Sequence, residues 1–153
     1  MNIIRFISFF CILNLSIHAQ SIDSQELNQL MNKWHQSASE ADFNSYFDFT
    51  TDDFIFLGTD PTERWDKKQF MAFSKPYFDK GKAWDFKCIE RNWVLDYSKD
   101  MIWFDETLNT WMNTCRGSGI LIKTKAGWKL IYYNLTVLIE NEKIKGFIEL
   151  RKQ

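Results

Sequence analysis

Two adjacent acids in an aromatic stretch are the residues of this chain best suited to chemistry. Asp105 and Glu106 follow Trp103 and Phe104 directly. Successive side chains of a strand point to opposite faces, so only one of the two acids can face an interior. A carboxylate among aromatic rings has its pKa raised by loss of water, as a general base near neutrality requires. A solvated or salt-bridged strand residue is the alternative for either acid.

A basic residue beside two glycines could serve the same site. Arg116 opens the segment Arg116-Gly117-Ser118-Gly119. The glycines permit a bulge or a close backbone approach. The guanidinium could then turn inward to meet Asp105 or an anionic ligand, with a structural ion pair as the alternative. The segment has no strand-to-helix context, so we do not interpret it as a phosphate-binding loop.

The segment 128–139 has two apolar faces and is expected to be a strand covered on both sides. On one face a phenol, an amide and a hydroxyl stand in a row, at Tyr132, Asn134 and Thr136, which favours a pocket wall. The other face is expected to meet a second subunit, because it would otherwise be an exposed apolar patch. Its residues are Ile131, Tyr133, Leu135 and Val137. Cover by a C-terminal helix of the same chain is the alternative.

Other catalytic and metal-binding chemistries have little support. His35 is the sole histidine beyond the first nineteen residues, and no Gly-x-Ser-x-Gly motif accompanies it. No cluster of His, Cys and Asp has ligand spacing, so we expect neither a metal nor a cofactor.

The first nineteen residues have the features of a signal peptide. Arg5 precedes an apolar run over 6–15, and Ala19 offers a cleavage site. The run is too short for a membrane span. We therefore expect a secreted or periplasmic protein whose mature domain is 20–153. Removal of Arg5 changes the net charge from −1 to −2. This charge, with no basic tract, argues against nucleic-acid and membrane partners.

The remainder of the 153-residue chain predicts one α+β domain. Helices are expected over 24–38, 41–47 and 66–80, with a break or kink at Pro76, and a buried strand at 54–57. Four long strands follow over 84–97, 101–112, 116–124 and 128–139, joined by short turns into an antiparallel meander. A short terminal helix closes the chain. Cys88 and Cys115 then lie two strands apart, too far for a disulfide.

The order of these elements resembles the nuclear transport factor 2-like superfamily, and within it the SnoaL-like domains. The resemblance also rests on Gly58-Thr59-Asp60-Pro61 before the third helix and on Gly127-Trp128-Lys129-Leu130 at the last long strand. It implies a cone-shaped, strongly curved antiparallel sheet packed against N-terminal helices and enclosing a cavity. Members often form homodimers through the outer face of the sheet. They include isomerases, dehydratases and non-catalytic binding domains, so the fold alone does not decide the function.

Two positions depart from the kinase-association branch of that superfamily. Its last long strand carries two histidines where this chain has Tyr132 and Asn134. An arginine of its pocket corresponds to Asp105, two residues after Trp103. The match favours Asp105 over Glu106 as the acid that faces the cavity.

Three functions follow as hypotheses. The first is an exported module that binds a small, largely apolar ligand. The second is a cofactor-independent lyase or isomerase with Asp105 as its base and Tyr132 or Asn134 polarising a carbonyl. The third is a non-catalytic interaction domain filled by its own side chains. Trp65 is either a lid or a packing residue, and Tyr46 either pocket wall or core. The expected ligand-binding residues are Tyr46, Trp65, Trp103, Asp105, Arg116, Tyr132 and Asn134.

Overall fold

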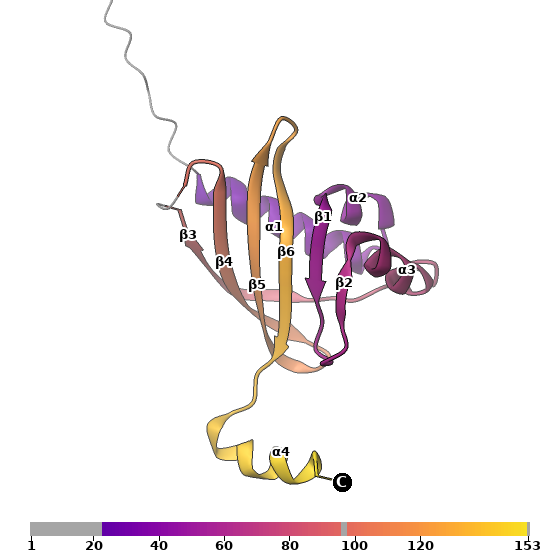
Figure 1. Ribbon diagram of the computed structural model, residues 1–153, viewed down its shortest axis with the longest axis vertical. Helices are drawn as coiled ribbons and strands as arrows, with labels where there is room; N and C mark the ends of the chain where they lie inside the picture. Colours follow the sequence, from indigo (N-terminus) through magenta and orange to yellow (C-terminus); the bar gives the residue numbers. More distant parts are fainter. Residues whose placement is uncertain (1–22, 96–97, 153) are drawn as a thin grey trace, which may run out of the picture.

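The computed structural model describes residues 23–95 and 98–152 (Figure 1). In chain order the elements are α1 (Ser24–Ser39), α2 (Phe43–Asp48), β1 (Thr50–Leu57), β2 (Arg64–Asp66), α3 (Lys67–Phe78), β3 (Lys87–Val94), β4 (Met101–Thr110), β5 (Asn113–Thr124), β6 (Gly127–Val137), the 3-10 turn η1 (Asn141–Lys143) and α4 (Ile144–Leu150). The expected signal peptide lies outside the described residues. Among the described helices, none has the length and hydropathy needed to cross a membrane.

Side-chain caps fix where the first and third helices begin. The Asp23 carboxylate accepts a hydrogen bond from the Gln25 backbone N–H at 2.8 Å. Asp66 and Gln69 form a reciprocal capping box at α3, as their spacing predicts. Pro76 does not restart α3, because it stands in the last turn and removes one intrahelical hydrogen bond there.

The sheet has six strands in the order β2-β1-β6-β5-β4-β3. Strands β3 to β6 form the predicted antiparallel meander. Strand β1 pairs in parallel with β6, so the expectation of a wholly antiparallel sheet is wrong. The segment between β1 and β6 contains β2, α3 and the first three strands of the meander, and parallel neighbours require a long connection of this kind. The sheet is open at both edges and only mildly curled, not a strongly curved cone (Figure 1).

One face of the sheet carries the helices and the core. Helix α1 crosses this face, and α2 and α3 lie toward β1 and β2 (Figure 1). The core between the layers is rich in aromatic rings, including Trp34, Tyr46, Phe54, Phe70 and Tyr133. Helix α4 lies apart from the sheet at the end of the connection from β6. The predicted α+β class is confirmed.

A bulge in β6 decides which of its residues face the helices. The pairing with β5 shifts between Leu130 and Tyr132, leaving Ile131 as the extra residue. Leu130 before the bulge and Tyr133 and Leu135 after it are all buried in the core. The expected strict alternation is therefore wrong beyond Ile131. Tyr133 and Leu135 do not face a second subunit, whereas Tyr132 and Asn134 lie on the side away from the helices.

The two cysteines of the described chain are free. Cys88 lies opposite Leu108 of β4, which in turn lies opposite Cys115 of β5. The cysteines are thus two strands apart, and the prediction of unpaired thiols is confirmed.

Candidate functional site

A buried carboxylate lies at the centre of the interface between α1 and the sheet. Glu106 of β4 has no exposed surface. Ile102, Phe104 and Leu108 flank it on the same face of the strand, and all are buried. Glu106, and not Asp105, is therefore the acid that faces the interior.

Each oxygen of the Glu106 carboxylate accepts two hydrogen bonds. Oε1 accepts from the Tyr133 hydroxyl at 2.7 Å and lies 2.8 Å from His35 Nε2. Oε2 accepts from Nε of Arg91 at 2.9 Å and from Nη2 at 2.7 Å. A carboxylate offers about four lone-pair positions, so the acceptor capacity of Glu106 is filled.

Helix α1 contributes to this network through three residues on one face. Asn28, Asn32 and His35 follow one another at helical spacing, four and three residues apart. Arg91 Nη1 donates to Asn28 Oδ1 at 3.0 Å and to Asn32 Oδ1 at 3.1 Å. Trp93 Nε1 also donates to Asn28 Oδ1, at 3.0 Å. The network therefore joins α1 to strands β3, β4 and β6.

The electrostatics of the cluster keep Glu106 ionised. Burial by itself raises the pKa of this carboxyl, but its electrostatic interaction and hydrogen bond with His35, the Arg91 charge and the Tyr133 hydrogen bond together lower it to about 2. Burial, and then the Glu106 charge, raise the pKa of Tyr133 well above its usual value, so the phenol stays a donor. A base that works near neutrality needs a pKa near the working pH. Glu106 is accordingly an anchor for the fold and a poor proton acceptor.

The glycines of β5 make room for this arrangement. A Cβ on Gly117 would overlap the Tyr133 hydroxyl and lie 2.7 Å from Tyr133 Cζ. A Cβ on Gly119 would lie 2.6 Å from Phe104 Cε1. The close backbone approach expected at this segment is confirmed, and it serves Tyr133 and Phe104 of the core.

Five of the expected ligand-binding residues do gather, but on the other face of the sheet. Trp103 lies across β5 from Tyr132, and Asp105 across it from Asn134, in two adjacent rows. Asp105 is exposed, and its carboxylate accepts a 3.4 Å hydrogen bond from Asn92 Nδ2. The expectation that Asp105 faces the aromatic interior is wrong, because the apolar alternation of β4 places its neighbour Glu106 there.

The expected inward turn of Arg116 is also wrong. Arg116 is exposed and lies opposite Thr107 of β4 and Thr136 of β6. Its strand keeps regular pairing at this point, so nothing redirects the side chain. The arginine that pairs with a buried acid is Arg91, whose side chain is 2 % exposed.

The remaining two expected residues lie on the helix side. Tyr46 is buried and stacks on Trp34 with ring centroids 4.8 Å apart, so it belongs to the core. Trp65 lies on β2, a short strand that the sequence analysis did not predict. Its ring stacks against Phe73 at 4.3 Å and against Phe70 at 5.6 Å.

Trp65 is part of an aromatic cleft, the second candidate feature of this face. The cleft has a volume of about 140 Å³. Its apolar walls are Phe56, Trp65, Phe70, Phe73, Trp84, Phe86, Trp111, Met112 and Leu135, and its polar edge is formed by Gly58, Thr59 and Glu63. Trp111, at the turn after β4, is 82 % exposed, which is unusual for a side chain as large and apolar as tryptophan. Within residues 23–95 and 98–152, no group of three or more His, Cys, Asp or Glu side chains is placed to hold a metal ion.

Comparison with known proteins identifies the family to which this fold belongs. The family model for the SnoaL-like domain matches residues 27–140. The chain belongs to the SnoaL-like domain family. No match was found among curated proteins.

Solved structures share the fold of this SnoaL-like domain at low sequence identity. A nuclear transport factor 2-like protein of unknown function from Pseudomonas putida is 12 % identical, with 78 % of this chain and 89 % of that chain covered at a TM-score of 0.64. One from Cytophaga hutchinsonii is 16 % identical, with 76 % and 100 % covered at 0.60. A domain with a cystatin-like fold from Nostoc punctiforme is 11 % identical, with 86 % of each chain covered at 0.67.

Sequence reasoning missed the residues of the Glu106 network other than Glu106 itself. The spacing of Asn28, Asn32 and His35 on one face of a predicted helix was a usable signal, since it sets three polar groups against the sheet. The apolar pattern Ile102, Phe104 and Leu108 was another, because it places Glu106 inward. Nothing in the sequence indicates that Arg91 would be the partner.

Proposed function

We propose that this chain is an exported SnoaL-like domain that binds a small, largely apolar ligand in the aromatic cleft. The observation that carries the proposal is the composition of the cleft, where aromatic rings from β1, β2, α3 and residues 84–86 meet beside Leu135. Binding sites for small molecules are concave, mostly apolar and edged by a few polar groups. Gly58, Thr59 and Glu63 supply such an edge here.

The volume of the cleft limits the ligand. An apolar protein cavity of roughly 150 Å³ holds a molecule of benzene size. At about 140 Å³ the aromatic cleft suits one ring or a short branched chain, or one end of a longer molecule. Trp111 at the mouth adds an exposed ring that a bound ligand could cover.

Neither candidate acid supports the catalytic alternative. Asp105 is exposed, and Glu106 combines a pKa of about 2 with a filled set of hydrogen bonds. Glu106 therefore lacks the pKa of a general base near neutrality, and Asp105 lies outside the aromatic interior. Binding without turnover is therefore the better account of this face.

The outer face of the sheet supports association with a second copy of the chain. One row across five strands there is apolar or aromatic, formed by Ile55, Tyr132, Ile120, Trp103 and Val94. Such a row exceeds the scattered apolar residues normal for a monomer surface. The homodimer interface that we propose uses this row, in place of the residues expected from strict alternation in β6.

Export remains a proposal that rests on the first nineteen residues. Their charged start, apolar run and Ala19 are typical of a cleaved signal peptide. The mass of the protein recovered outside the cytoplasm should correspond to a chain beginning at Gln20, whereas a mass that includes Met1 would contradict cleavage.

The ligand proposal is tested with fluorobenzene as a probe of benzene size. Titration followed by fluorine NMR should show saturable binding to the wild-type protein. Trp111→Ala should raise the Kd about tenfold, equivalent to about 1.4 kcal/mol, without altering stability. Tyr77→Ala is the matched control, because Tyr77 is an exposed aromatic residue that does not line the cleft. Absence of saturation, or an equal effect of both substitutions, would count against the proposal.

A further inference from the structure

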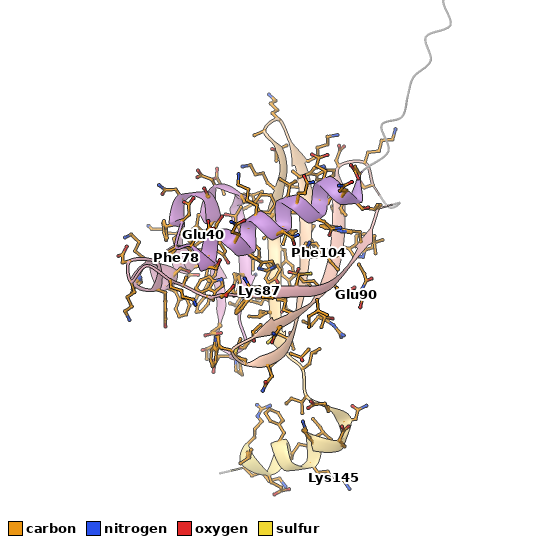
Figure 2. The ribbon with its side chains drawn as sticks, turned by 180° about the vertical axis from the view of Figure 1, so that it is seen from behind. Glu40, Phe78, Lys87, Glu90, Phe104 and Lys145 are labelled. Atoms are coloured by element: carbon orange, nitrogen blue, oxygen red, sulfur yellow. The ribbon has the colours of Figure 1, made fainter. Side chains whose placement is uncertain are left out.

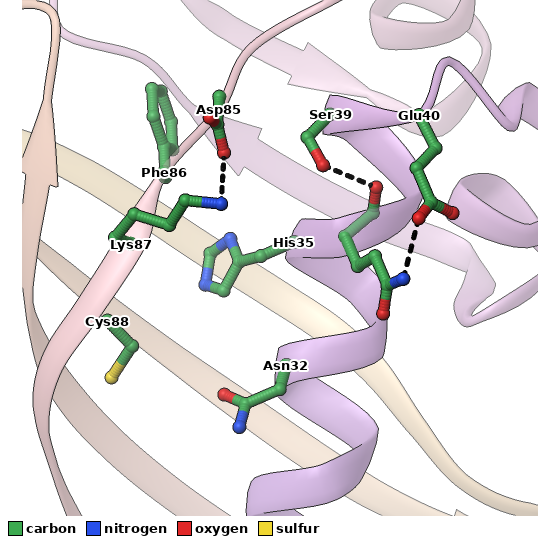
Figure 3. Close-up of a pocket in the computed structure, with 9 residues that line it drawn as sticks. Asn32, His35, Ser39, Glu40, Asp85, Phe86, Lys87 and Cys88 are labelled. Carbon is green, nitrogen blue, oxygen red and sulfur yellow. Dashed lines mark hydrogen bonds and ion pairs between the residues drawn. The ribbon is translucent and has the colours of Figure 1, made fainter.

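A second cleft shares Phe86 with the aromatic cleft and lies between α1 and the start of β3. Its volume is about 420 Å³. Helix α1 contributes Asn32 and His35, and Glu40 follows as its C-cap. The facing segment contributes Asp85, Lys87 and Cys88 (Figure 3). Figure 2 shows Glu40 at the end of α1 and Lys87 on the segment opposite. We call this feature the His35 cleft. Unlike the aromatic cleft, it is lined mainly by polar side chains.

The His35 ring points from α1 toward residues 85–88 (Figure 3). The side chain is 6 % exposed, and Nε2 lies 2.8 Å from the ionised Glu106. A carboxylate accepts only, so Nε2 carries a proton and donates it. In the neutral imidazole, Nδ1 then keeps its lone pair. Among the hydrogen bonds of the described residues, none involves Nδ1. The cleft thus contains a buried ring whose Nδ1 has no hydrogen-bond partner among the described residues.

The charged groups of the His35 cleft are two carboxylates and one ammonium. The Glu40 carboxylate accepts a 2.6 Å hydrogen bond from Gln36 Nε2, and the second carboxylate belongs to Asp85. Lys87 Nζ lies 2.8 Å from Asp85 Oδ1, but its side chain is 69 % exposed and belongs to the rim. Burial, and more weakly the Glu106 charge, raise the pKa of Cys88, so its thiol stays protonated. Two carboxylates against one ammonium leave the charged side chains of the cleft with a net negative charge.

We propose that the His35 cleft is a second ligand site, which binds a small protonated amine. An ammonium group presents three donors and one positive charge. Nδ1 of His35 can accept one donor at pH 8 when the ring is neutral, and Glu40, the carboxylate that is not paired with Lys87, provides opposite charge at the cleft. This site takes a ligand of different chemistry from the aromatic cleft and does not depend on binding there.

Titration with methylammonium at pH 8, followed by nitrogen NMR of the imidazole, tests the proposal. His35 is the only histidine beyond residue 19, so its ring signals are unambiguous in the mature protein. Methylammonium should shift the Nδ1 signal in a saturable way, and acetate at the same ionic strength should not. Shifts that stay linear in concentration, or that acetate reproduces, would overturn the proposal.

A pair of variants on α1 makes the test specific. Glu40→Gln removes a cleft carboxylate and should weaken methylammonium binding about two- to fivefold, as expected for an exposed charge. Glu26→Gln removes the exposed acid of the first turn of the same helix, roughly 21 Å away along its axis, and should leave binding unchanged. Equal Kd values for wild type and Glu40→Gln would also overturn the proposal.

Discussion

Glu106 remains charged inside the core because its four acceptor positions are filled by His35, Tyr133 and Arg91. Burying a charge costs several kcal/mol unless partners compensate for the lost water. The compensation comes from α1, β3 and β6 at once, so a single side chain couples three elements to β4. The neighbouring residue Asp105 takes no part in this network, because its side chain lies on the opposite, exposed face of β4.

Replacing Glu106 by Gln should therefore destabilise the protein strongly. The change leaves the Arg91 guanidinium buried without its counter-charge, at a cost of about 3–5 kcal/mol. Asp105→Asn is the matched control, and its effect should stay within about 0.5 kcal/mol because Asp105 is exposed. Urea unfolding of the two variants measures both values. Similar losses for the two would contradict the assignment of Glu106 as the anchor.

Acid should remove the same contribution. The pKa of Glu106 is about 2 in the folded protein and about 4.5 in the unfolded chain. A carboxyl with a lowered pKa stabilises the fold above the unfolded pKa and loses that effect as pH falls through the folded pKa. The difference in unfolding free energy between wild type and Glu106→Gln should therefore shrink as pH falls from about 4.5 to about 2. Urea unfolding across this range checks it, and a difference independent of pH would show that the charge is unimportant.

At the scale of elements, the β6 bulge explains where prediction from sequence fails. Strand positions and the antiparallel meander follow from apolar patterns and short turns, and these were predictable. The side of the sheet on which each β6 residue lies was not predictable. The extra residue Ile131 exchanges the two sides of the strand for all residues after it. Tyr132 and Asn134 were assigned inward by alternation from Trp128 and Leu130. A bulge leaves no residue signature in this strand that could have corrected the assignment.

Strand β1 was only partly predictable for a different reason. Its buried core, Phe54 and Phe56, stands out as an apolar run, but its pairing with β6 joins segments some eighty residues apart. Local patterns carry no information about such pairings, so the parallel contact and the mixed sheet could not be anticipated. Trp65 was predicted as either a lid or a packing residue, because the three-residue strand β2 is too short to be recognised from its sequence pattern.

Strand β5 should be intolerant of a side chain at Gly117. The new methyl group of Gly117→Ala would displace the Tyr133 hydroxyl from Glu106, and overpacking of this kind costs about 1–3 kcal/mol. Gly146→Ala provides the control, because a Cβ there meets no atom within 4 Å. Thermal unfolding should separate the two variants clearly. A Gly117→Ala protein as stable as wild type would mean that Tyr133 does not approach the strand so closely.

At the scale of the whole molecule, the two faces of the sheet carry different features. The helix side holds the core, the Glu106 network and the aromatic cleft. The outer side presents the row from Ile55 to Val94, with Arg116 and Asp105 beside it. The resemblance to the superfamily led to the correct fold and to a dimer hypothesis, but the residues that it favoured for a cavity lie on the outer face.

The dimer proposal predicts the effect of one charge on that outer face. Ile120→Lys places an ammonium in the middle of the row and should convert a dimer into a monomer of about 16 kDa, the mass expected after signal cleavage. Ile89→Lys is the control, since Ile89 is 64 % exposed on the edge strand β3. Light scattering at micromolar concentration measures both. A wild-type protein that is already monomeric would contradict the proposal.

Native mass spectrometry tests most directly whether the aromatic cleft holds a small apolar ligand. The protein purified from its source should carry a non-covalent small molecule, released on gentle activation and largely absent from Trp111→Ala. The exposure of Trp111 makes a folding defect in this variant unexpected. A wild-type mass equal to that of the polypeptide alone, or an adduct retained equally by Trp111→Ala, would contradict the claim.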